Sequence, residues 1–134
     1  MVKAMYSGDI SPKKTFEALN TDPNAVLIDV RTPAEWTYVG IPLMEAMIQA
    51  SWPPPPENPD FAATIKNLGV PLDAPVYLIC RSGIRSARAA SELIAAGYKT
   101  CYNVAEGFEG DRDNNGHRGS IGGWKVAGLP WAQG

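Results

Sequence analysis

The sequence predicts an α/β protein built on a mostly parallel β-sheet. Two short apolar runs, residues 25–30 and 75–79, have the composition of strands that are covered on both faces. Helix signals occur before, between and after these runs, and strands that alternate with helices form parallel sheets with right-handed crossovers. The chain has 134 residues, of which 45% are hydrophobic, which is typical of one globular domain. We therefore expect a single domain over residues 1–134.

The first helix is predicted from a cap and a short apolar stripe. Ser11 is a favourable N-cap residue, and Pro12 suits the first turn. Phe16 and Leu19 are three residues apart, on what becomes the buried face. We expect this helix to end at about Asn20.

The apolar run 25–30 is followed directly by a second helix signal. Thr32 and Glu35 have the spacing of a capping box, in which each side chain binds a backbone N–H group at the helix start. We expect a brief helix through Trp36. The order of elements to this point is helix, strand, helix.

The middle of the chain is less regular. Residues 40–51 combine a turn-like stretch with an apolar one, and we predict one short strand there. The prolines of residues 53–56 cannot continue a helix or a central strand, so we interpret them as a stiff connector rather than a ligand for a proline-binding partner. A further helix is expected to begin at Asn58. Its apolar stripe and its glycine stop are Phe61, Ile65, Leu68 and Gly69.

The clearest strand in the chain, residues 75–79, leads directly into Cys80. After a loop, apolar residues recur at helical spacing: Ala87, Ala90, Leu93 and Ile94. Gly97 marks the end of that helix. Residues 100–104 resemble one more strand, and residues 106–123, rich in Gly, Asp and Asn, are expected to be mostly loop. The unit around Cys80 is therefore strand, tight loop, helix.

Composition argues against several classes of function. The formal net charge is −2, so the sequence predicts neither nucleic-acid binding nor a basic membrane-binding surface. The first residues lack the apolar run of a signal peptide, and no segment approaches the roughly 20 apolar residues of a membrane span, so we expect a cytoplasmic protein. Cys80 and Cys101 are too few for a disulfide framework and lack the spacing of a zinc site. We expect neither a metal nor a cofactor.

Cys80 has the sequence surroundings of a reactive thiolate. In parallel α/β sheets, ligands bind at the carboxyl ends of strands, where loops lead into helix N-termini. Within the cysteine loop, residues 80–86, the six residues 80–85 reverse the chain and point backbone N–H groups at a common centre. The helix dipole and the charges of Arg81 and Arg85 also favour a thiolate, and Gly83 permits the tight backbone. We therefore expect Cys80 to ionise more readily than an ordinary cysteine, whereas the alternative is an inert cysteine at a strand end.

Other noticeable residues have structural interpretations. Cys101 lies within a predicted strand and is expected to be an inert core residue. Residues 111–116 imitate the start of an EF-hand calcium loop, but a glycine occupies the twelfth position, so we expect a polar loop. His117, the only histidine, is expected to be exposed to solvent rather than to donate a proton or contact an acceptor. Trp124 and Trp131 are expected to pack the C-terminal end against the core.

Three stretches of the chain together resemble the rhodanese-like single-domain sulfurtransferases. The first is Asp-Val-Arg-Thr-Pro-Ala-Glu-Trp at residues 29–36, and the second is Cys-Arg-Ser-Gly-Ile-Arg at residues 80–85 of the cysteine loop. The third is Asn-Val at residues 103–104, followed by Gly-Gly-Trp at 122–124 and Gly-Leu-Pro at 128–130. The resemblance spans nearly the whole chain. It implies a parallel five-stranded sheet flanked by helices on both faces.

The resemblance also implies a chemistry and a set of site residues. Cys80 would take sulfur as a persulfide from a small anionic donor such as thiosulfate and pass it to a thiol, cyanide or a protein acceptor. The rest of the cysteine loop would bind the substrate, namely Arg81, Ser82, Gly83, Ile84, Arg85 and Ser86. Three residues of the first stretch would support the site structurally, namely Asp29, Arg31 and Glu35.

Two alternative functions remain open. Related phosphatases and arsenate reductases place five residues between cysteine and arginine, which makes a wider cradle for a tetrahedral oxyanion. Four residues separate Cys80 from Arg85 here, and the wider spacing would fall on Ser86, so the loop length favours sulfur transfer. The other alternative is a non-catalytic binding module that presents Cys80 or residues 53–56 to a partner.

The chain departs from the family pattern in two places. The family usually has Gly-His-Ile-Pro-Gly-Ala after the first stretch, whereas this chain has Gly-Ile-Pro-Leu-Met at residues 40–44. Residues 111–121 also split the third stretch. Both differences alter the surroundings of Cys80, so the resemblance does not identify the acceptor.

Overall fold

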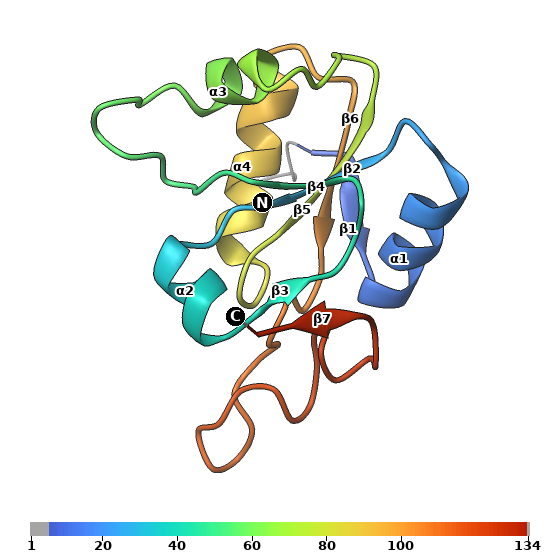
Figure 1. Cartoon of the computed structure of the whole chain (residues 1–134), viewed down its shortest axis with the longest axis vertical. Coiled ribbons are helices and arrows are strands. Elements are labelled where there is room, and N and C mark those ends of the chain that lie inside the picture. Colours follow the sequence, from blue (N-terminus) through green and yellow to red (C-terminus); the bar gives the residue numbers. More distant parts are fainter. Residues whose placement is uncertain (1–5, 134) are drawn as a thin grey trace, which may run out of the picture.

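Five strands form one parallel sheet in the computed structural model, which describes residues 6–133 (Figure 1). Their order across the sheet is β1-β6-β5-β2-β4. The bounds are β1 Gly8–Ile10, β2 Val26–Asp29, β4 Met47–Gln49, β5 Pro75–Ile79 and β6 Thr100–Val104. A separate antiparallel pair joins β3 (Ile41–Pro42) to β7 (Trp131–Ala132). The parallel sheet confirms the predicted fold class.

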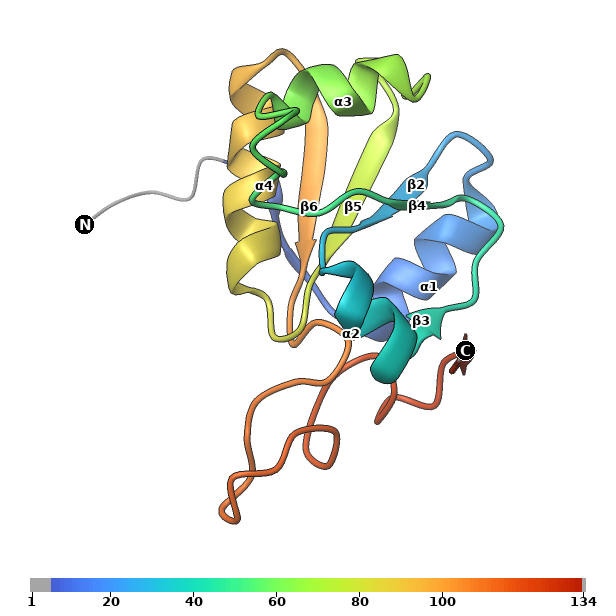
Figure 2. The same cartoon turned by 60° about the vertical axis from the view of Figure 1, so that its left-hand side comes forward.

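Helices cover both faces of the sheet. They are α1 (Pro12–Thr21), α2 (Pro33–Tyr38), α3 (Phe61–Asn67) and α4 (Ile84–Ala95). Figure 2 shows α3 and α4 on one face and α1 on the other. The short α2 lies near the end of the sheet toward which β5 and β6 run. This end carries the site described below.

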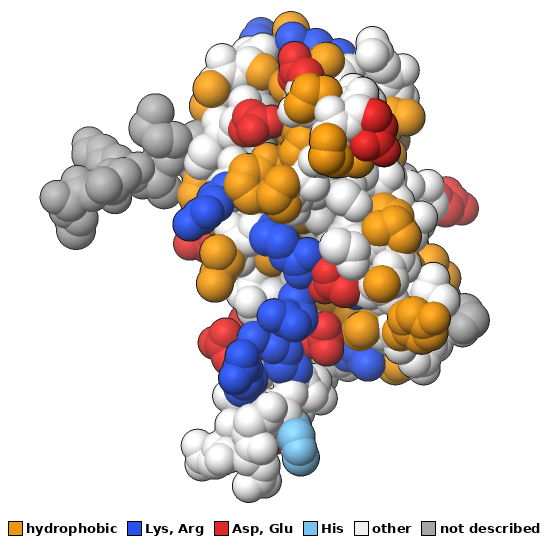
Figure 3. Space-filling view, turned by 90° about the vertical axis from the view of Figure 1, so that its left-hand side faces the viewer, with side chains coloured by type: hydrophobic (Ala, Val, Ile, Leu, Met, Phe, Trp, Pro, Cys, Tyr) orange, Lys and Arg blue, Asp and Glu red, His pale blue; other side chains and the backbone are white. Residues whose placement is uncertain are grey.

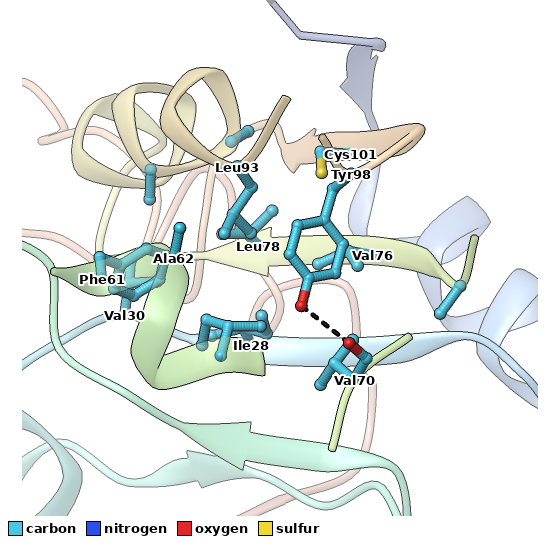
Figure 4. Packing of buried hydrophobic residues seen from close by; sticks show 14 of the residues in the cluster. Ile28, Val30, Phe61, Ala62, Val70, Val76, Leu78, Leu93, Tyr98 and Cys101 are labelled. Carbon is cyan, nitrogen blue, oxygen red and sulfur yellow. Dashed lines mark hydrogen bonds between the residues drawn. The ribbon is translucent and has the colours of Figure 1, made fainter. Parts of the chain in front are cut away.

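The alternation of side chains along β5 explains its continuous apolar sequence. Val76, Leu78 and Cys80 belong to the core on the α3–α4 side, whereas Tyr77 and Ile79 belong to the core on the α1 side. A central strand covered on both faces has no solvent-facing positions for polar residues. Figure 4 shows the α3–α4 core, where the Tyr98 hydroxyl donates to the Val70 carbonyl at 2.8 Å.

The predicted caps at the first two helices are confirmed. The Ser11 hydroxyl accepts a hydrogen bond from the Lys14 backbone N–H at the start of α1. At the start of α2, Thr32 and Glu35 form both hydrogen bonds of the capping box. These contacts satisfy N–H groups that the first turn of a helix leaves without partners.

Several boundaries differ from the prediction. β1 was not predicted, because its three residues show no pattern of their own and become a strand by pairing with β6. The expected start of α3 at Asn58 is wrong, because Asp60 is the N-cap and accepts from the Ala63 N–H. α4 begins earlier than its apolar stripe suggested, at Ile84. The last three residues of the cysteine loop therefore lie in the first turn of α4.

The C-terminal part of the chain packs against the α1 side of the sheet. Trp124 is completely buried and meets Phe16 edge to face, with ring centroids 6.0 Å apart. Its indole N–H donates to the Pro130 carbonyl. Trp131 is 36% exposed and contacts Phe108, so the predicted packing is more complete for Trp124. Between residues 6 and 133, no helix combines the length and apolar character needed to cross a membrane.

Candidate active site

Cys80 lies at the carboxyl end of β5 and at the N-terminus of α4. Its sulfur accepts hydrogen bonds from the Gly83 backbone N–H at 3.0 Å and from the Ser86 hydroxyl at 3.1 Å. Gly83 is the N-cap of α4 and has a left-handed backbone with φ of 106°, as the tight loop requires. The Cys80 sulfur thus lies beside two hydrogen-bond donors and the positive end of a 12-residue helix. Cys80 itself is only 1% exposed.

Residues 105–124, the C-terminal segment, bind the carbonyl groups of the cysteine loop. The Phe108 N–H donates to the Cys80 carbonyl at 2.8 Å. The N–H groups of Glu109 and Gly110 both donate to the Arg81 carbonyl, at 3.0 and 3.2 Å. The approach is close, since a Cβ atom at position 107 would lie 2.5 Å from the Cys80 carbonyl oxygen. The carbonyl side of the loop is therefore occupied, and the N–H of Gly83 is directed at the sulfur.

Arg85 forms a bidentate ion pair with Glu35 across α4 and α2. The two bonds measure 2.7 and 2.9 Å. Burial is the largest influence on Glu35 and would raise its pKa, but the hydrogen bonds from Arg85 and Thr32, together with the Arg85 charge, outweigh it and lower the pKa to about 2. Arg85 is therefore neutralised by a partner from α2. Arg81, by contrast, has an exposed side chain.

Asp29 and Arg31 form a second ion pair, which is fully buried behind the site. Arg31 donates to both carboxylate oxygens of Asp29 at 2.9 and 2.7 Å, and to the Gly40 carbonyl at 2.7 Å. Its guanidinium group also lies 4.3 Å from the ring centre of Phe108. One side chain thus connects the end of β2 to the start of β3 and to the C-terminal segment.

Asn103 reaches the site from β6 and was not identified as a site residue by sequence reasoning. It is 5% exposed, and its Oδ1 accepts from the Ser86 hydroxyl at 2.5 Å. Its Nδ2 donates to Asp9 at 2.9 Å and to the Gly83 carbonyl at 3.1 Å. The sequence signal that could have identified Asn103 is its polar side chain near the carboxyl end of the predicted strand 100–104, because a buried polar group needs hydrogen-bond partners.

The remaining predicted residues of the loop lie at its surface. Ser82 is partly buried, whereas the Ile84 side chain is 68% exposed. Figure 3 shows Lys and Arg side chains gathered in a band that runs down one face to the protruding C-terminal segment, with acidic side chains beside them. The positive charge on this face is therefore local and partly balanced.

The other residues considered from the sequence lie apart from this contact network. Cys101 is fully buried, and burial raises its pKa to about 12. His117 is exposed in the C-terminal segment. Asp113 accepts hydrogen bonds from groups of its own loop, namely Asn115 N, His117 N and Ser120 Oγ. Over the part of the chain that the structure describes, no three His, Cys, Asp or Glu side chains are grouped so that they could hold a metal ion.

Comparison with known proteins identifies the family. The protein-family model described as the rhodanese-like domain matches residues 12–113 of the sequence. The chain belongs to the rhodanese-like domain family. A crystal structure of Rv0390 from M. tuberculosis superposes with a TM-score of 0.85 at 42% identity, covering 96% of this chain and 99% of that one. An uncharacterized protein of Rickettsia rickettsii is 37% identical over 127 residues, 92% of this chain and 95% of that protein.

A further relative has a name that states an activity. Thiosulfate sulfurtransferase 18 of Arabidopsis thaliana is 35% identical over 112 residues, which cover 78% of this chain and 76% of that protein. The resemblance seen in the sequence is thus confirmed at the level of the rhodanese-like family.

Proposed function

We propose that this rhodanese-like protein is a cytoplasmic sulfurtransferase that carries sulfane sulfur as a persulfide on Cys80. The observation that carries the proposal is the contact of the Cys80 sulfur with two donors, Gly83 N–H and Ser86 Oγ–H, at the N-terminus of α4. Such an environment favours the thiolate nucleophile through both donors, and it favours the anionic persulfide that replaces it through the Gly83 N–H and the positive end of α4. The name of the plant relative makes thiosulfate the first donor to test.

The proposed reaction has two steps. The Cys80 thiolate attacks the outer sulfur of thiosulfate, a new bond to Sγ forms, and the sulfur–sulfur bond of thiosulfate breaks with its electron pair leaving on sulfite. The persulfide then carries its charge on the outer sulfur. An acceptor thiolate or cyanide attacks that sulfur, and the bond to Sγ breaks to restore the Cys80 thiolate.

The cysteine loop would hold the substrates. The exposed Arg81 would attract the anionic donor, and the loop residues Ser82, Gly83, Ile84 and Ser86 would line its path. Arg85 would act with its partner Glu35, because the ion pair fixes the first turn of α4 beside the sulfur. Asp29 and Arg31 would keep the scaffold behind the loop in place.

The test is the intact mass of the purified protein before and after incubation with thiosulfate or, separately, with polysulfide, and again after cyanide. A gain of one sulfur atom that cyanide removes is expected for the wild type and for Cys101→Ala. Cys80→Ser is expected to gain nothing while retaining the circular dichroism spectrum of the wild type. A wild-type protein that gains no sulfur from thiosulfate or polysulfide would overturn the proposal and favour a binding module.

A further inference from the structure

The Ser86 hydroxyl contacts two acceptors but has only one proton. Its oxygen lies 3.1 Å from the Cys80 sulfur and 2.5 Å from Asn103 Oδ1. A hydroxyl donates one hydrogen bond at a time, so the proton lies on one contact or on the other. The charge of the sulfur decides which contact receives it.

The amide orientation of Asn103 is determined by its other neighbours. Its Nδ2 faces the Asp9 carboxylate at 2.9 Å and the Gly83 carbonyl at 3.1 Å, both of which accept hydrogen bonds. The same Asp9 oxygen also receives the Tyr6 hydroxyl at 2.8 Å. A reversed amide would place its oxygen against two acceptors, so Oδ1 must face Ser86.

A neutral Cys80 satisfies every member of this network. The thiol S–H donates to the Ser86 oxygen, and Ser86 in turn donates to Asn103. With a thiolate, the Ser86 proton must turn to the sulfur, which leaves Asn103 Oδ1 beside a hydroxyl lone pair without a donor. Asn103 therefore opposes negative charge on Sγ, while Gly83 N–H favours it.

We propose that Asn103 is a positioning residue that draws the Ser86 proton away from Cys80 and so favours the forms in which Sγ is uncharged, the thiol and the persulfide. In the persulfide, the charge lies on the outer sulfur, so Ser86 donates to Asn103 again. The network then destabilises only the thiolate. Because the persulfide is not destabilised, the transfer of sulfur to Cys80 becomes more favourable. This inference rests on the proposed function, in which the Cys80 thiolate is the nucleophile.

Other charged and titratable groups surround the site but are the same in the variants to be compared. They come from the cysteine loop and α4, from β1 and β2 with the residues that flank them, and from α2, β6 and the C-terminal segment: Arg81, Arg85, Arg88, Tyr6, Asp9, Asp29, Arg31, Glu35, Cys101, Tyr102, Glu106 and Glu109. Asp9 accepts a hydrogen bond from Asn103, and Tyr6 also contacts the Asn103 side chain; the hydrogen bond from Tyr6 to Asp9 is expected to persist in the variants.

The test is the pH dependence of alkylation of Cys80 by iodoacetamide, followed by peptide mass spectrometry. Asn103→Leu keeps the size of the side chain and removes the acceptor. The pH midpoint of alkylation is expected to fall by about one unit, which gives about a tenfold faster reaction below the midpoint. Asn103→Ala carries the same expectation if the leucine variant does not fold.

A purely structural role of Asn103 predicts the opposite sign. Loss of its bond to the Gly83 carbonyl would loosen the loop, weaken the Gly83 N–H contact with sulfur and raise the midpoint. A raised or unchanged midpoint would therefore overturn the inference. In a Ser86→Ala background the Asn103 substitution is expected to leave the pH midpoint of alkylation unchanged. If the midpoint falls as far there as in the wild-type background, the inference would also be overturned. Alkylation needs no sulfur donor, so this result is independent of the mass measurement that tests the proposed function.

Discussion

Substitution of Glu35 by glutamine removes the charge that balances Arg85 while preserving the size of the side chain. The pKa of Glu35 falls from an ordinary 4.5 to about 2 in the folded protein. A shift of this size corresponds to roughly 3 kcal/mol of folding free energy, since each pKa unit is about 1.4 kcal/mol. Both side chains are mostly buried, at 26% and 19% exposed, so solvent screens the pair only in part. We expect Glu35→Gln to lower the free energy of unfolding at pH 7 by about 2–3 kcal/mol.

The sign of the pH dependence follows from the lowered pKa. A carboxylate whose pKa is depressed on folding contributes its full stabilisation above its unfolded value of 4.5, and this is lost as pH falls toward about 2. The difference between wild type and Glu35→Gln should therefore be constant from pH 7 to 5 and less than half as large at pH 3.

Urea unfolding at several pH values, monitored by circular dichroism, measures this difference. Glu57→Gln is the matched control, because Glu57 is exposed in the connector before α3. It is expected to change the free energy of unfolding by less than about 0.5 kcal/mol. A Glu35→Gln effect no larger than that of the control, or one of equal size at pH 7 and pH 3, would refute the assigned role of the ion pair.

Three further predictions concern the surroundings of the site. Cys101, with a pKa raised to about 12 by burial, should resist alkylation at pH 8 in the folded protein and react after denaturation, as peptide mass spectrometry would show. Asp29→Asn leaves Arg31 buried without its counter-ion and should lower the free energy of unfolding by about 3–5 kcal/mol; a loss below 1 kcal/mol would contradict this. Gly107→Ala should destabilise the protein by more than about 2 kcal/mol in the same assay, because the added methyl group meets backbone atoms of the cysteine loop. Gly116→Ala has a similar positive φ but open space, so it should cost less; equal costs would count against the steric argument.

Elements with an internal sequence pattern were predictable, whereas those defined by their partners were not. The run 75–79 and the capping box at Thr32 carry their signals within a few residues, and the structure has both. β1 becomes a strand only through its pairing with β6. Its Asp9 is part of the candidate site because that pairing brings it to Asn103, 94 residues away in the chain.

The site residues also divide into those predictable from local sequence and those that depend on partners far along the chain. The position of Cys80 after a buried strand could be predicted from local sequence, because parallel strands end at one edge of the sheet. The pairing of Glu35 with Arg85 joins residues 50 positions apart and depends on how α2 packs against α4. The family resemblance assigned Arg85 to the substrate, and the structure adds a partner, Glu35, that the resemblance did not assign to it.

The orientation of the cysteine loop depends on a segment far along the chain. Successive carbonyl and N–H groups of a tight loop point in different directions, so a partner for one set helps to fix the other. The N–H groups of Phe108, Glu109 and Gly110 bind the carbonyls of Cys80 and Arg81, and the Gly83 N–H points at the sulfur. Residues 111–121, which depart from the family pattern, follow these contacts directly. Within them, the Gly119 N–H donates to the Glu109 carbonyl and Arg118 donates to the Gly110 carbonyl, both at 2.8 Å. The departure therefore binds the same two residues whose N–H groups hold the Arg81 carbonyl.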